Sequence, residues 1–129
     1  MAGQLNIQPP VLDLALYAGD GISFKLICTD NADPPQPVDV TGDIEAQIRV
    51  DRQSPDPPVA TFSADMSGAD VGEIVLSLTG DDTAALMDGG GVTKGKFTGQ
   101  WDIQWTQAGG EPRTLCQGKV ECIADVTRP

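Results

Sequence analysis

Apolar and polar residues alternate along most segments of this 129-residue chain. Between residues 44 and 50, for example, the polar side chains of Glu45, Gln47 and Arg49 separate four apolar ones. A period of two places alternate side chains on opposite faces of a β-strand, so this segment predicts a strand with one buried face and one wet face. Glycine and proline clusters separate such segments. We expect strands at residues 12–17, 22–28, 44–50, 60–66, 74–78, 101–105 and 116–122, the last extending to 126.

The predicted fold class is all-β. About seven short strands, together with Trp101 and Trp105 on one strand face, predict an antiparallel immunoglobulin-like β-sandwich. A small barrel is the alternative. We expect one short helix near residues 80–87, because Thr79 can cap its start and acidic residues follow in the first turn.

A chain of this length makes one domain, which we place at residues 11–129. Residues 1–10 then form an N-terminal arm or an edge strand. The stretch from Leu5 to Gln8 is long enough to add to the sheet edge of a neighbour, and it can equally be a strand of its own fold.

Charge and composition exclude several classes of function. The chain has 8 basic and 19 acidic residues and a formal charge of -11, which opposes binding to nucleic acids and to anionic membranes. It contains no histidine, so catalytic triads with histidine and histidine-ligated metals are excluded. We therefore expect no catalytic, cofactor-binding or metal-binding residues and predict that the protein is not an enzyme.

Three polar segments deserve comparison with known sites. The run Asp30-Asn31-Ala32-Asp33 has calcium-binding residue types, but it lacks the spacing of a calcium loop and favours a solvated turn. Asp81 and Asp82 are adjacent at a helix start, where a capping role is favoured over acid–base catalysis. The stretch from Gly89 to Lys96 contains glycines and lysines but no complete phosphate-loop motif, so we expect a mobile loop.

The tryptophans and cysteines favour structural roles. Trp101 and Trp105 form a sugar-stacking platform if they face solvent, but their strand pattern predicts that they lie in the core together with Ile103. Cys28, Cys116 and Cys122 form an odd set without a zinc-knuckle spacing. We expect them to be small buried side chains without a structural disulfide.

A set of short motifs occurs in a fixed order from residue 12 to the end of the chain. These are Tyr17-Ala-Gly-Asp20, Phe24, Asp39-Val-Thr-Gly42, Ala46-Gln-Ile-Arg49, Phe62, Gly72-Glu-Ile-Val-Leu-Ser-Leu78, Thr83-Ala-Ala-Leu86, Trp101-Asp-Ile-Gln104, Arg113-Thr-Leu115, Gly118-Lys-Val120 and Asp125-Val-Thr-Arg128. In order and spacing the chain resembles the small immunoglobulin-like domain of tailed-phage virion proteins and is similar to the N-terminal domain of the baseplate upper protein. Ala18 stands where that family often has an arginine, so no role of that arginine is expected here.

The resemblance implies a non-enzymatic virion protein, assembled in the host cytoplasm. Its expected partners are other virion structural proteins of the tail, the baseplate or the capsid, and several copies or a homo-oligomer are expected. The alternative is a carbohydrate-binding or adhesin module that uses exposed aromatic side chains.

Overall fold

The computed structural model describes residues 10–30, 32–51, 53, 56–88, 91–107 and 109–124. The larger sheet, sheet A, contains β1 (Leu14–Tyr17), β3 (Asp43–Arg49), β4 (Ala60–Thr61), β7 (Val92–Thr93), β8 (Lys96–Thr106) and β9 (Pro112–Ile123). The smaller sheet, sheet B, contains β2 (Ile22–Ile27), β5 (Ser63–Asp65) and β6 (Glu73–Leu78). The remaining elements are α1 (Gly80–Ala85) and the 3-10 turns η1 (Ala69–Val71) and η2 (Leu86–Asp88). The predictions of an all-β chain and of one short α-helix are confirmed.

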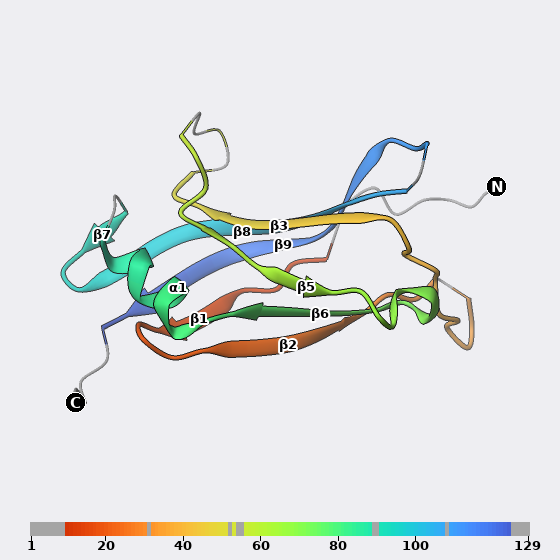
Figure 1. The fold of residues 1–129 in the computed structure, drawn as a ribbon, viewed down its shortest axis with the longest axis horizontal. Helices are drawn as coiled ribbons and strands as arrows, with labels where there is room; N and C mark the ends of the chain where they lie inside the picture. The colour runs from red at the N-terminus through yellow and green to blue at the C-terminus, as the bar shows by residue number, and fades with distance from the viewer. Residues whose placement is uncertain are drawn as a thin grey trace.

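The two sheets lie in two layers with the core between them (Figure 1). Sheet A has the strand order β1-β9-β8-β3-β4, with β7 paired to one end of β8, and sheet B has the order β2-β6-β5. Both sheets contribute fully buried side chains to one cluster, among them Ile48 and Ile103 from sheet A and Ile74 and Leu76 from sheet B. The arrangement is therefore sandwich-like, as the alternating segments predict.

Aromatic side chains join the two layers. Trp101 of β8 is 2% exposed, and its ring centroid lies 5.9 Å from that of Phe24 on β2 in an edge-to-face contact. Phe62 lies between β4 and β5, with its ring centroid 5.6 Å from Trp101 and 6.0 Å from Phe24. The prediction that Trp101, Ile103 and Trp105 are buried on one strand face is confirmed.

The first strand departs from the antiparallel prediction. β1 pairs parallel to β9, whereas the other strand pairs of the described residues are antiparallel. The segment before β1 runs along β9, where Leu12 donates its N–H to the carbonyl of Gln117 at 2.7 Å. Gly118 allows this close approach, because a Cβ added there would lie only 1.9 Å from the carbonyl oxygen of Leu12.

The predicted strand at 60–66 is two strands in different sheets. β4 pairs with β3, and β5 pairs with β6. Between them Phe62 is buried and donates its N–H to the carbonyl of Ala46. Burial does not keep a period of two through this crossing, because all three residues of β5 are exposed, Ala64 among them. The alternation of residue types therefore predicts neither the change of sheet nor the exposure of Ala64.

The helix begins as its sequence predicts. Thr79 accepts a hydrogen bond from the N–H of Asp82, whose carboxylate accepts one from the N–H of Thr79, which completes a capping box. Thr83 is fully buried, and its hydroxyl accepts from the N–H of Gly19 and can donate to the carbonyl of Asp20, at 3.0 and 2.9 Å. These contacts fix α1 against the turn between β1 and β2. No helix among the described residues is long and apolar enough to cross a membrane.

Candidate functional site

The outer face of sheet A, which points away from sheet B, contains a polar groove between β3 and β8. Its volume is about 320 Å³. The lining residues are Glu45, Gln47 and Arg49 from β3 and Gln100, Trp101, Asp102 and Gln104 from β8. The Trp101 side chain is buried in the core, and the other six side chains stand on the outer face. They stand opposite one another in three cross-strand pairs, because the register places residue 45 against 104, 47 against 102 and 49 against 100. We name this feature the sheet A groove.

Hydrogen bonds hold one end of the sheet A groove. The guanidinium of Arg49 donates through Nη2 to Oε1 of Gln47 at 3.1 Å and through Nη1 to the carbonyl of Asp56. Asp56 belongs to the segment after β3, which rises from sheet A on the side away from sheet B (Figure 1). The β8–β9 hairpin rises on the same side at the other end of the sheet (Figure 1). The groove therefore lies on a sheet face with a projecting segment at each end.

Charges on this face are nearly balanced. The charged side chains that face outward from β3, β8 and β9 are Asp43, Glu45, Arg49, Lys96, Asp102, Lys119 and Glu121. Four are acidic and three are basic, so this face carries one of the eleven net negative charges of the chain. The outer face of sheet A is thus a nearly neutral area on a strongly acidic protein.

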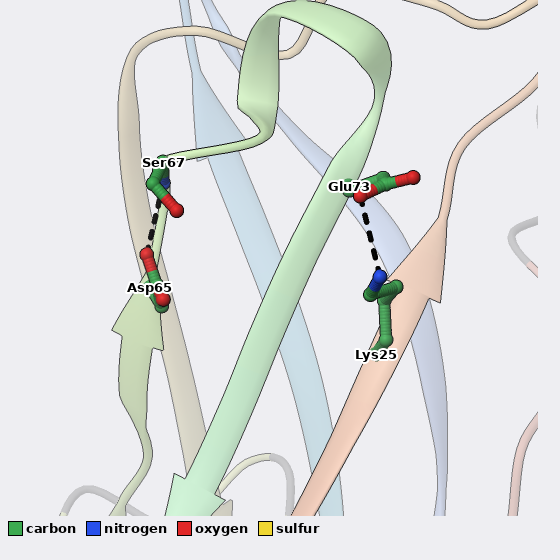
Figure 2. A network of polar contacts seen from close by, with 4 residues as sticks. All are labelled: Lys25, Asp65, Ser67 and Glu73. Atoms are coloured by element: carbon green, nitrogen blue, oxygen red, sulfur yellow. Dashed lines mark hydrogen bonds and ion pairs between the residues drawn. The ribbon is translucent and has the colours of Figure 1, made fainter.

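The outer face of sheet B has a simpler polar surface. Lys25 on β2 forms an ion pair with Glu73 on β6 at 3.3 Å, and both side chains are about half exposed (Figure 2). On β5, the carboxylate of Asp65 accepts a hydrogen bond from the N–H of Ser67 at 2.9 Å (Figure 2). This bond is the main cause of the lowered pKa of Asp65. These contacts connect neighbouring residues of one surface and define no groove.

The tryptophans provide no sugar-stacking platform. Trp101 and Trp105 are 2% and 7% exposed. Their indole N–H groups donate to backbone carbonyls, that of Trp101 to Leu12 at 2.8 Å and that of Trp105 to Thr41 at 3.2 Å. Both side chains act in the core, and the interpretation that they face solvent is wrong.

The described residues of the acidic run at 30–33 make the backbone contacts of a turn, which its sequence favours. The carboxylate of Asp30 accepts hydrogen bonds from the N–H groups of Ala32 and Gln36, both at 3.0 Å. These bonds lower the pKa of Asp30, with the Gln36 bond as the larger cause. Asn31 lies outside the described residues. Within the described residues there is no group of three or more potential metal ligands.

The glycine- and lysine-rich segment is partly a tight hairpin. Gly89 and Gly90 lie outside the described residues. After them, β7 pairs with the start of β8 across a turn in which Lys94 and Gly95 both have positive φ. That geometry is typical of a two-residue hairpin. The expectation of a mobile loop is therefore corrected for the part from Val92 to Lys96.

The cysteines are free thiols in the structure. Cys116 and Cys122 are buried, and Cys28 is half-buried, less deeply than the sequence predicts. Burial raises the pKa of all three thiols, and the neighbouring Cys116 raises that of Cys28 further. The thiols are therefore protonated at neutral pH, which disfavours a nucleophilic role.

The N-terminal arm falls almost wholly outside the described residues, which begin at Pro10. The Pro10 carbonyl accepts a hydrogen bond from the N–H of Gln117 at 3.1 Å. The proposed strand from Leu5 to Gln8 therefore stays a prediction.

Sequence reasoning identifies the wet faces of β3 and β8 but misses the groove that they form together. The alternation of Glu45, Gln47 and Arg49 is visible in the sequence, as is that of Gln100, Asp102 and Gln104. Their meeting depends on which strands are neighbours and on their register, neither of which the alternation specifies.

Comparison with known proteins assigns no family. No family model matches the chain, and no curated protein matches it.

Proposed function

We propose that this protein is an immunoglobulin-like module of a tailed-phage virion, which binds another structural protein of the tail, the baseplate or the capsid without catalysing a reaction. The resemblance of its ordered motifs to that domain family motivates the proposal. The strand order is the observation that best supports it.

The spatial order of six strands supports an immunoglobulin-like sandwich. In those domains one sheet contains the second, fifth and fourth strands in that spatial order, and the other contains the seventh, sixth and third. Here β2-β6-β5 corresponds to the first set and β9-β8-β3 to the second, with β4 as an added strand beside β3. The first strand differs, because in those domains it belongs to the sheet of the second strand, whereas β1 pairs with β9 in the other sheet. This correspondence supports an immunoglobulin-like module, whereas a small barrel would need one closed sheet.

Motifs that carry the resemblance meet in the fold. Thr83 lies in one motif and forms hydrogen bonds with Gly19 and Asp20 of another. Gly118, in a third motif, lies where the Leu12 carbonyl crosses β9. Residues of these motifs thus form long-range contacts of the fold, which supports the proposal that the motifs belong to one domain type.

An exposed sheet edge supports a role in binding a protein. β2 is an edge strand of sheet B, and no described strand pairs with the side of β2 that faces away from β6. Cys28 donates its N–H to the carbonyl of Gly72, so the backbone groups of the even-numbered residues of β2 point towards β6. The N–H and carbonyl of odd-numbered residues such as Lys25 therefore point to the open edge. Ile27 at the end of this strand is 67% exposed. Such an edge can accept a strand from a partner, with backbone hydrogen bonds supplying the affinity.

Gene deletion and complementation test the proposal. Deleting the gene should yield particles that lack the protein and are defective in assembly or infection, and the natural gene should restore them. Lys25→Pro removes an edge N–H, whereas the matched control Lys25→Ala keeps it. We expect the alanine variant to complement and the proline variant, once shown to be folded, to complement poorly. Particles of unchanged composition and infectivity after deletion would overturn the proposed function.

A further inference from the structure

We propose that the sheet A groove binds an uncharged oligosaccharide. This binding function goes beyond the proposed structural role and does not depend on it. It also differs from the tryptophan platform, because both tryptophans are buried.

The chemistry of the groove matches sugar hydroxyls. Its lining provides three amides, two carboxylates and one guanidinium, all planar groups with fixed hydrogen-bonding directions. A sugar hydroxyl both donates and accepts, so neighbouring hydroxyls can pair with an amide or with a carboxylate beside a guanidinium. The volume of about 320 Å³ is at the lower end of the range for small-molecule sites, about 300–1,000 Å³.

The groove is largely preorganised. Gln47, Arg49, Gln100 and Asp102 are half-buried, although they lie on an outer sheet face. Arg49 is held by Gln47 and by the carbonyl of Asp56. Side chains on paired strands with restricted rotamers lose less entropy on binding than exposed loop side chains.

Charge and polarity favour an uncharged sugar over other occupants. The outer face of sheet A has a net charge near zero, while the rest of the protein is strongly acidic and repels anions. The residues that dominate protein interfaces are chiefly Trp, Tyr and Arg in fully desolvated pockets. Arg49 of the groove is already held by Gln47 and by the carbonyl of Asp56. Trp101 also lines the groove, but its side chain lies in the core and is 2% exposed, so the side chains open to an occupant are polar.

Binding of purified protein to an array of neutral and acidic oligosaccharides provides the first test. Titration calorimetry with the best neutral oligosaccharide then measures the dissociation constant of the parent and of the variants. Gln100→Ala and Gln104→Ala each remove one amide from the groove. Lys25→Ala, on the outer face of sheet B, is the matched control. We expect each groove variant to weaken binding by about threefold to tenfold and the control to leave it unchanged.

Several results would overturn the inference. These are the absence of binding to any neutral oligosaccharide, binding to acidic glycans alone, or equal affinities of parent and groove variants. Loss of particle incorporation in groove variants of a protein that binds no sugar would identify the groove as a protein contact instead. Should a variant fail to fold, backbone amide shifts of the parent decide the matter. Shifts centred on β3 and β8 during the sugar titration support the groove, and shifts centred elsewhere refute it. Because these assays use purified protein, their failure leaves the virion proposal standing.

Discussion

Trp101 connects the two sheets, and its replacement tests the packing directly. The indole is 2% exposed and contacts Phe24 of sheet B and Phe62 at the crossing between the sheets. Its N–H donates to the carbonyl of Leu12 at 2.8 Å, which attaches the segment before β1. Trp101→Ala removes both the aromatic contacts and this hydrogen bond.

Two variants separate the aromatic packing of Trp101 from its hydrogen bond by the size of the stability loss. Burial of a tryptophan predicts that Trp101→Ala lowers the free energy of unfolding by about 3–5 kcal/mol. Trp101→Phe keeps an aromatic ring in the core but removes the N–H, so we expect a smaller loss of about 1–3 kcal/mol. Either loss is large beside the total stability of a typical domain, about 5–15 kcal/mol.

Urea denaturation followed by far-ultraviolet circular dichroism measures these losses. We expect the unfolding midpoint to fall from the parent to Trp101→Phe and further to Trp101→Ala. Gln104→Ala, on the outer face of the same strand, should stay within about 0.5 kcal/mol of the parent. A Trp101→Ala variant as stable as the parent would refute the placement of this side chain between the sheets.

Further predictions concern the first strand, the acidic turns and the thiols. Gly118→Ala should lower the free energy of unfolding by about 1–3 kcal/mol in the same urea assay, because its Cβ would meet the Leu12 carbonyl. The control is Gly21→Ala, whose Cβ would lie 3.5 Å from the nearest atom. Equal unfolding midpoints of the two variants would contradict the close approach at Gly118. Hydrogen bonds lower the pKa values of Asp30 and Asp65 below 3.8. The stability that these carboxylates contribute is fully present above their unfolded pKa and is lost as pH falls through their folded pKa, so Asp30→Asn should weaken the fall in urea midpoint between about pH 5 and pH 2.5. An unchanged pH profile of this variant would argue against the turn. Reductant and chelator should leave the melting temperature unchanged, since the thiols are free and the described residues contain no cluster of three or more potential metal ligands. A drop of several degrees with either reagent would refute this prediction.

Local structure in this protein is predictable from the sequence because the local patterns agree with the fold. Alternation predicts β2, β3, β6, β8 and β9, since each has one face on the core and one in water. The start of α1 is predictable because Thr79 and Asp82 have the residue types and spacing of a capping arrangement.

The arrangement of the strands is less predictable. The parallel pairing of β1 depends on Gly118, a single small residue more than 100 positions away from Leu12. The change of sheet at Phe62 is not visible in the alternating residue types, and Ala64, an apolar position of that pattern, is exposed. The sheet A groove forms only when β3 and β8 pair in one particular register. These features come from long-range contacts, which local patterns do not specify.

Mass spectrometry of purified particles tests the proposed function most directly. Particles are separated on a density gradient from cultures that carry the natural gene, and the protein is quantified relative to the major capsid protein in each fraction. We predict that it sediments with the particles, in a fixed ratio to the capsid protein and in several copies per particle. Its absence from the particle fractions, with all of it in the infected-cell extract, would contradict the account.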